Sequence, residues 1–178
     1  IDFVYEWNRV SQLMDLLPIF LNIKNRRCVV VGGGDVALRK ASLLLRAGAK
    51  LVVVAERVSA ELQSLCDAHQ AVIESRSFEP ELLQDAALVI AATDDPVINK
   101  KISQHAKLLG IPVNVVDQPE LCSFIMPAIV DRSPVLIAIS SGGTSPVLTR
   151  KLKELNEIMI PNRIDKLAKL LAAYREQV

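Results

Sequence analysis

The chain has 178 residues, of which 51% are hydrophobic and 23% are charged. This balance excludes the disordered class of protein, because it supplies enough apolar surface to build a core. The formal net charge is +1, so no overall positive field would recruit nucleic acid or an anionic membrane.

Cysteine usage points to a reducing environment. The chain has three scattered cysteines, Cys28, Cys66 and Cys122, which show neither Cys-x-x-Cys nor Cys/His spacing. The sequence therefore predicts no disulfide framework and no resident metal site, and it favours a cytoplasmic location.

Two stretches bear on targeting. Residues 1–13 precede Met14 and lack the basic start and apolar run of a secretory signal, so we interpret them as an upstream extension outside the fold. The longest uncharged stretch, residues 133–149, contains two prolines and two glycines. Such a stretch does not suit a membrane-spanning helix, and we expect no membrane partner.

From residue 25 onward, short apolar runs alternate with helical patterns. Residues 28–31 predict a strand that ends in three glycines, and apolar residues then recur with helical spacing as far as residue 45. Further strands are predicted at residues 51–54, 71–73, 87–92 and 112–116, with intervening helices that begin at Ser59 and Asp95. The alternation predicts an α/β fold, a Rossmann-like doubly wound parallel sheet over residues 14–125.

The alternation stops after Asp117. Prolines interrupt two strand-like runs around residues 124–126 and 135–139, and Ser145 followed by Pro146 opens an amphipathic helix. We expect residues 126–160 to form a small α+β region whose apolar faces pack on the first domain or on another subunit. Residues 161–178 begin a helical segment without a stop signal, which is compatible with a fragment of a longer protein.

A glycine motif lies between the first predicted strand and helix. Residues 32–37, Gly-Gly-Gly-Asp-Val-Ala, fit the G-x-G-x-x-A fingerprint in the context that it requires. Gly32 permits the tight turn, Gly34 lets the backbone approach a pyrophosphate, and the helix N-terminus favours phosphate. The motif predicts a dinucleotide site.

The choice between NAD and NADP depends on the end of the second strand. Glu56 lies 24 positions after Gly32, slightly later than the acidic residue that holds the ribose hydroxyls in NAD sites. Arg57 beside it would attract a 2′-phosphate, so NADP stays open, as does the interpretation of both as solvated loop charges. Thr93 and Asp117 follow later strands, at the carboxyl edge where ligands bind.

Residues 140–145 form a second glycine-containing turn into a helix. Ser141, Gly142 and Gly143 could present N–H groups to an anion, although a simple helix cap is equally compatible with the pattern.

Several motifs in the same order resemble the siroheme synthase family, in the half that oxidises precorrin-2. The resemblance covers Met14 to about residue 155. It is carried by residues 32–37 (GGGDVA), 91–95 (AATDD), 114–117 (NVVD), 123–127 (SFIMP), 131–134 (DRSP) and 140–146 (SSGGTSP).

The resemblance implies a dehydrogenase that passes a hydride from precorrin-2 to NAD⁺ and gives sirohydrochlorin. In bifunctional members Fe²⁺ is then inserted as a transient substrate. It also implies a homodimer formed through residues 126–160, and a methyltransferase domain that is either fused or separate. The cofactor contacts carried over are Gly32, Gly33, Gly34, Asp35, Val36, Glu56, Arg57 and Thr93.

Asp117 would be the catalytic aspartate, which suits a reaction that needs a proton acceptor beside the hydride acceptor. The polycarboxylated substrate needs cations and hydrogen-bond donors. The candidates are Arg39, Lys40, Asn114, Arg132, Ser141, Gly142, Gly143 and Arg150. Each cation is also compatible with ordinary surface charge.

Two rival functions remain. A non-catalytic NAD-binding redox sensor would use the same fold but would tolerate loss of Asp117. An NADP-linked reductase of another small substrate would share the glycine motif, but it gives no reason for the motifs at residues 114–117 and 140–146.

Overall fold

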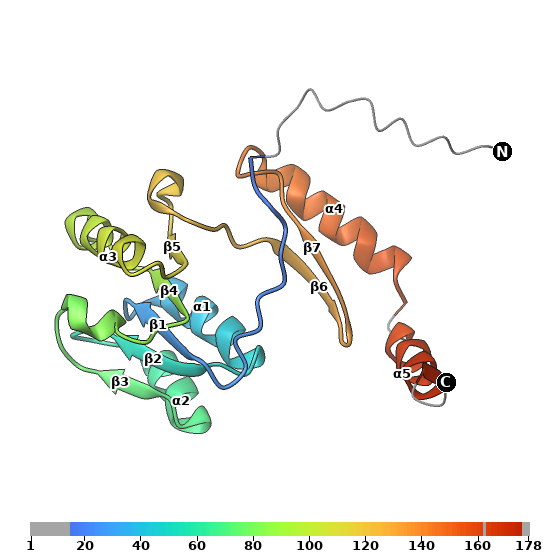
Figure 1. Cartoon of the computed structure of the whole chain (residues 1–178), viewed down its shortest axis with the longest axis horizontal. Coiled ribbons are helices and arrows are strands. Elements are labelled where there is room, and N and C mark those ends of the chain that lie inside the picture. Colours follow the sequence, from blue (N-terminus) through green and yellow to red (C-terminus); the bar gives the residue numbers. More distant parts are fainter. Residues whose placement is uncertain (1–14, 162, 176–178) are drawn as a thin grey trace.

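The computed structural model describes residues 15–161 and 163–175 of the chain (Figure 1). The expected upstream extension, residues 1–13, lies outside the described residues. The strands are β1 (Arg27–Val31), β2 (Lys50–Val54), β3 (Val72–Glu74), β4 (Leu88–Ala91), β5 (Val113–Val115), β6 (Ala128–Arg132) and β7 (Val135–Ile139). The helices are α1 (Asp35–Arg46), α2 (Ala60–His69), α3 (Pro96–Leu108), α4 (Pro146–Met159) and α5 (Ile164–Arg175), with short 3-10 helices at Pro80–Leu83 and Pro119–Leu121.

The first five strands form one parallel sheet in the order β3-β2-β1-β4-β5. This order confirms the predicted doubly wound Rossmann-like fold, in which the chain reverses direction across the sheet between β1 and β4. Apart from Arg27 at the start of β1, both strands are runs of Val, Ile, Leu, Ala and Cys that are buried throughout. Strands covered on both faces show such uninterrupted apolar runs.

Helices cover both faces of this sheet. Alternate side chains of the strands point to opposite faces and form two clusters. Val30 and Ile90 pack with α1 and α2 on one face, whereas Val29 and Val89 pack with α3 and the Pro80–Leu83 turn on the other. Each fully buried side chain of this size stabilises the fold by roughly 1.5–3 kcal/mol. The result is a rigid platform under the carboxyl edge of the strands.

The predicted helix starts are confirmed. The Ser59 hydroxyl accepts the Leu62 N–H at 3.2 Å at the start of α2, and the Asp95 carboxylate accepts the Val97 N–H at 2.8 Å at the start of α3. Ser145 caps α4 in the same way. Such caps satisfy backbone donors that the first turn of a helix leaves free.

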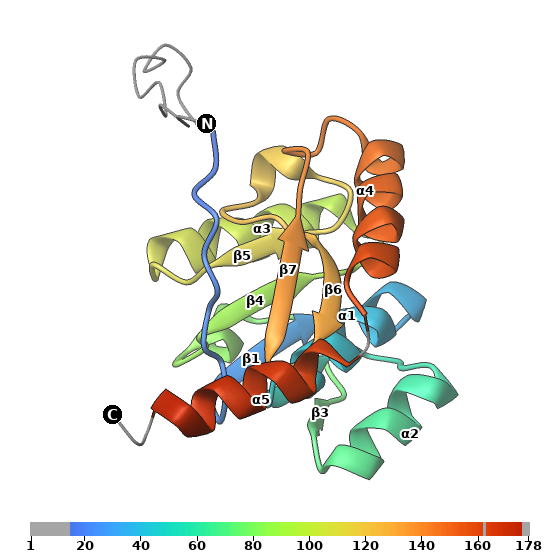
Figure 2. The same ribbon diagram turned by 90° about the vertical axis from the view of Figure 1, so that its right-hand side faces the viewer.

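Strands β6 and β7 form a separate antiparallel hairpin, and α4 and α5 contact this hairpin (Figure 2). The expected strand at residues 124–126 is wrong, because the hairpin begins only at Ala128. The chain just before it is bound to the edge of β5: the Ser123 N–H donates to the Val113 carbonyl at 2.8 Å. Pro127 then separates this segment from the hairpin. The division of the chain after residue 125 stays a prediction.

Helix α4 presents a stripe of exposed apolar side chains. None of its residues is buried, and the stripe, spaced at three and four residues, comprises Leu148, Leu152, Leu155 and Met159. No helix within residues 15–161 and 163–175 is long and apolar enough to span a bilayer.

Candidate functional site

A cleft of about 630 Å³ lies at the carboxyl ends of β1, β2 and β4. This is the crevice in which open α/β sheets bind ligands. The structure brings all of the residues predicted to bind the cofactor into its lining, namely Gly32, Gly33, Gly34, Asp35, Val36, Glu56, Arg57 and Thr93.

The three glycines of the turn meet different constraints. Gly32 has φ of +132°, and a Cβ there would lie 2.2 Å from the Ala92 carbonyl oxygen. A Cβ on Gly33 would lie 1.9 Å from the Arg57 carbonyl oxygen, whereas one on Gly34 would meet no atom within 4 Å. The first two glycines are therefore needed by the protein itself. The open side of Gly34 leaves room for a ligand against the backbone, which fits the pyrophosphate of a dinucleotide.

The N-terminus of α1 is open toward this space. Gly34 occupies its N-cap position, and no described side chain caps the helix. The helices α2, α3 and α4 are each capped by a side-chain oxygen. The free N–H groups and the helix dipole of α1 suit a phosphate group.

The ribose side of the cleft contains residues that sequence analysis missed. Glu56 is exposed and accepts a hydrogen bond from the Ser77 hydroxyl. Arg76, which also lines the cleft, pairs with Glu74 at 3.3 Å and Glu79 at 3.2 Å. Their position in the sequence could have predicted a place in the cleft, because these residues follow β3 at the same carboxyl edge of the sheet.

A buried asparagine fixes the turn after β4. The Thr93 hydroxyl donates to the Asn99 Oδ1 at 2.7 Å, and the Asn99 Nδ2 donates to the Thr93 carbonyl at 2.9 Å. Asn99 is only 2% exposed. This reciprocal pair holds Thr93 in the wall of the cleft, and nothing in the helical pattern of α3 distinguished Asn99 beforehand.

Asp117 lies just beyond β5, exposed and at the carboxyl edge of the sheet. Lys40 on α1 is electrostatically coupled to it. Burial, followed by repulsion from Arg39, lowers the pKa of Lys40, while the Asp117 carboxylate and then Cys122 act in the opposite direction. The half-buried Lys40 therefore lies near the candidate catalytic carboxylate of Asp117. The exposed Arg39 is the neighbour of Lys40 in the chain.

Asn114 is buried in the structure and is 7% exposed. Its Nδ2 donates to the Phe124 carbonyl at 3.1 Å and lies 3.6 Å from the Cys122 sulfur. The amide therefore binds the chain segment that crosses the edge of β5. Its predicted contact with substrate stays a prediction.

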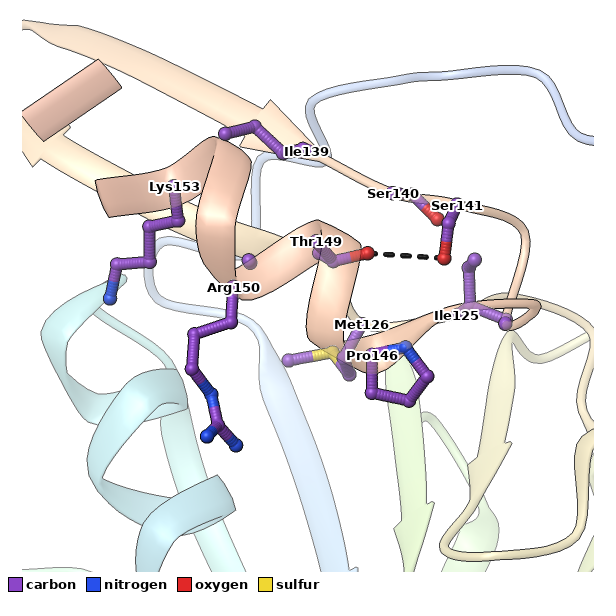
Figure 3. Close-up of a pocket in the computed structure, with 11 residues that line it drawn as sticks. Ile125, Met126, Ile139, Ser140, Ser141, Pro146, Thr149, Arg150 and Lys153 are labelled. Carbon is purple, nitrogen blue, oxygen red and sulfur yellow. Dashed lines mark hydrogen bonds between the residues drawn. The ribbon is translucent and has the colours of Figure 1, made fainter. Parts of the chain in front are cut away.

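A second cavity, of about 420 Å³, lies between the hairpin and α4 (Figure 3). It gathers Ser141, Gly143 and Arg150 from the predicted substrate residues and adds Lys153, whereas Gly142 is not in its lining. The Ser141 hydroxyl accepts the Ser145 N–H at 3.0 Å and the Thr149 hydroxyl at 3.1 Å. The turn is thus firmly held, and two cations of α4 line one cavity with it.

Arg132 lines neither cavity. Its guanidinium donates to the Glu157 carbonyl at 3.3 Å and to the Ile160 carbonyl at 3.4 Å. Cations commonly bind the free carbonyls at the end of a helix. The structure therefore separates Arg132 from the other predicted substrate residues.

Comparisons with known proteins agree with this geometry. Residues 19–128 match the family described as putative NAD(P)-binding. Siroheme synthases of Nitrosomonas europaea and Nitrosospira multiformis are 52% and 53% identical over 93% of the chain, which spans 35% and 36% of their lengths. The chain therefore covers about a third of these relatives.

A solved structure also matches most of the chain. SirC, described as a precorrin-2 dehydrogenase, is 30% identical, with a TM-score of 0.76, over 90% of this chain and 79% of its own. The chain belongs to the putative NAD(P)-binding family, in the group that contains siroheme synthases and SirC.

Proposed function

We propose that the chain oxidises precorrin-2 to sirohydrochlorin with NAD⁺. The observation that carries the proposal is the cleft beneath the open N-terminus of α1, with Asp117 on the same edge of the sheet. The similarity to siroheme synthases and SirC supports the substrate.

The overall step removes a hydride and a proton from the macrocycle and yields NADH. The nicotinamide, when bound, supplies the hydride acceptor, and the protein has to orient the two rings and accept the proton. The glycine turn and the uncapped helix bind the pyrophosphate in this scheme. Thr93, held by Asn99, forms the wall near the reacting groups.

Asp117 is the proton acceptor in this proposal. Its carboxylate is exposed at the carboxyl edge, and the half-buried Lys40 of α1 lies near enough to interact with it electrostatically. A positioned general base contributes about 10²–10⁴-fold to a rate.

The carboxylates of the tetrapyrrole need cationic partners. Lys40 lies near Asp117 and Arg39 lies near Lys40, while Ser141, Gly143, Arg150 and Lys153 line the second cavity. Charge-assisted hydrogen bonds from such groups bind carboxylates strongly. We assign substrate binding to these residues, with Asn114 shaping the loop behind Asp117.

Fe²⁺ insertion into sirohydrochlorin is a proposed second reaction. Fe²⁺ enters as substrate, and two pyrrole protons leave as it binds. Asp117 would accept these protons also, because the macrocycle would lie beside it in both steps.

We further propose a homodimer formed through the hairpin and α4, and a methyltransferase domain as a fused or separate partner. The exposed stripe of α4 supports the dimer, because contiguous apolar patches mark interaction surfaces. The length of the siroheme synthases, of which this chain spans about a third, supports the additional domain.

NAD is the proposed cofactor in preference to NADP. Glu56 presents a carboxylate to the cleft, which suits free ribose hydroxyls. Arg57 and Arg76 also line this region, although Arg76 is already paired with two carboxylates. Comparing the affinity of the protein for NAD⁺ and NADP⁺ by isothermal titration calorimetry tests the choice, and tighter NADP⁺ binding would contradict it.

The test of function uses the purified chain, precorrin-2 and NAD⁺. The visible spectrum should change from that of precorrin-2 to that of sirohydrochlorin as NADH forms in equal amount, and Fe²⁺ added without oxygen should then give siroheme. Binding of NAD⁺ without any spectral change of the tetrapyrrole would contradict the proposal and favour the redox sensor.

A further inference from the structure

The loop that carries Asp117 has an unfavourable backbone conformation. Asp117 has φ of +60°, in the left-handed region that most residues other than glycine avoid. It lies between β5 and the Pro119–Leu121 turn. Neighbouring groups therefore have to hold the loop if the carboxylate is to keep one position.

The Cys122 side chain contacts backbone groups on both sides of Asp117 in this loop. Its sulfur accepts the Val115 N–H at 3.1 Å and lies 3.3 Å from the Val115 carbonyl oxygen and 3.4 Å from that of Gln118. A thiol is both a weak donor and a weak acceptor, so it can bond to the chain before and after Asp117 at once.

Backbone bonds complete the same arrangement. The Gln118 N–H donates to the Val115 carbonyl at 3.4 Å, and the Cys122 N–H donates to the Pro119 carbonyl at 3.0 Å. Asn114 adds a longer contact of 3.6 Å from its Nδ2 to the Cys122 sulfur. The Cys122 thiol therefore contacts the chain both before and after Asp117.

The other two cysteines have a different setting. Cys28 and Cys66 are completely buried in the apolar cluster beneath α1 and α2. Burial raises the pKa of the Cys28 thiol to about 11, despite an opposing effect of Arg26. Both are packing residues, and they provide matched controls for Cys122.

We infer that Cys122 is a positioning residue for Asp117, holding the strained loop so that the carboxylate faces the substrate. The inference rests on the proposed function, because it assumes that Asp117 accepts the proton. A misplacement of about 1 Å in a reacting group can lower a rate a hundredfold, so loss of the thiol should act on turnover more than on cofactor binding.

The test compares Cys122→Ala, Cys122→Val and Cys122→Ser in the precorrin-2 oxidation assay. The alanine and valine variants should lower kcat about tenfold with an unchanged Kd for NAD⁺, and serine, which keeps a donor and an acceptor, should restore kcat to within about threefold of the wild type. Cys66→Ala should keep the wild-type kcat, because its effect is confined to packing. Valine also provides the comparison if the alanine variant fails to fold.

A double variant separates positioning from general damage. Adding Cys122→Ala to Asp117→Ala should cause no further loss of kcat, because the group that it positions is gone. An equal tenfold loss in both backgrounds, or an unchanged kcat in Cys122→Ala and Cys122→Val, would overturn the inference. Full activity of Asp117→Ala would instead remove the proposed role of Asp117, whereas no precorrin-2 oxidation by the wild type would overturn the proposed function, so the failures are distinguishable.

Discussion

The sheet domain (β1–β5 with α1–α3) and the hairpin region (β6, β7 and α4) differ in how far they bury their apolar side chains. In the sheet, strands such as β4 lie between helices on both faces, and Val89 is completely buried. In the hairpin region, α4 has no buried residue, and Leu155 is 44% exposed. The sheet thus contains its own core and a preformed cleft, whereas the hairpin region leaves apolar surface available for an interface.

The two neighbouring glycines of the turn provide the sharpest test of the preformed cleft. Gly33→Ala should destabilise the fold by about 3 kcal/mol, because its Cβ would collide with the Arg57 carbonyl. Gly34→Ala should leave the melting temperature unchanged but weaken NAD⁺ binding about tenfold, because its Cβ would occupy open space at the ligand. Calorimetry and NAD⁺ titration measure both. Equal effects of Gly33→Ala and Gly34→Ala on the melting temperature and on NAD⁺ affinity would contradict this interpretation.

Removal of the Asp117 carboxylate tests whether the sheet domain supplies the chemistry. Asp117→Ala should lower kcat for precorrin-2 oxidation about a hundredfold, since a general base is lost. Binding of NAD⁺ should persist, because Asp117 does not line the cofactor cleft. Stopped-flow spectra of the tetrapyrrole and a separate NAD⁺ titration measure the two effects. Normal turnover of Asp117→Ala would show that another group accepts the proton.

A charge on the α4 stripe tests the hairpin region as an interface. Leu155→Glu should raise the dissociation constant of the proposed dimer about tenfold or more, because a buried interface charge is costly. Sedimentation velocity over a range of concentrations measures the change. Glu157→Gln, on the opposite side of α4, is the matched control. An unchanged association state of Leu155→Glu would remove this surface from the dimer.

The smallest expected effect concerns the ion pair between the two regions, Arg46 on α1 with Asp131 on β6. Hydrogen bonds from Ser133, followed by Arg46, lower the pKa of Asp131 against an opposing effect of burial. Asp131→Asn should reduce stability by about 0.5 kcal/mol, since the pair is partly exposed.

The lowered pKa also predicts the pH dependence. The stabilisation is complete above the unfolded pKa of about 3.9 and disappears as the pH falls through the lower folded value. Unfolding of the wild type and of Asp131→Asn, compared at pH 7 and at steps below pH 4, should show the difference shrinking with acid. A difference that grows with acid would contradict the assigned direction.

Much of the sheet domain was predictable because its signals are local. Alternating apolar runs identify the strands, and a helix cap involves residues only two or three positions apart, as at Ser59 and Asp95. The rule that ligands bind at the carboxyl ends of parallel strands also placed Asp117 and the glycine turn at the correct edge.

The expected strand at residues 124–126 failed for the opposite reason. Its β-type composition is local, but the preceding Ser123 is hydrogen-bonded to Val113 of β5, ten residues earlier in the chain, and the Phe124 carbonyl accepts from the Asn114 side chain. Local composition does not specify such a partner.

The sequence by itself determined the doubly wound fold and the position of the cofactor turn, because periodicity and capping act over a few residues. Only the tertiary structure decided that Gly33 faces the Arg57 carbonyl, that Arg132 binds the end of α4, and that Cys122 closes the loop of Asp117. These contacts depend on how separate elements of the folded chain approach one another. The residue pattern within one element does not specify which other element lies next to it.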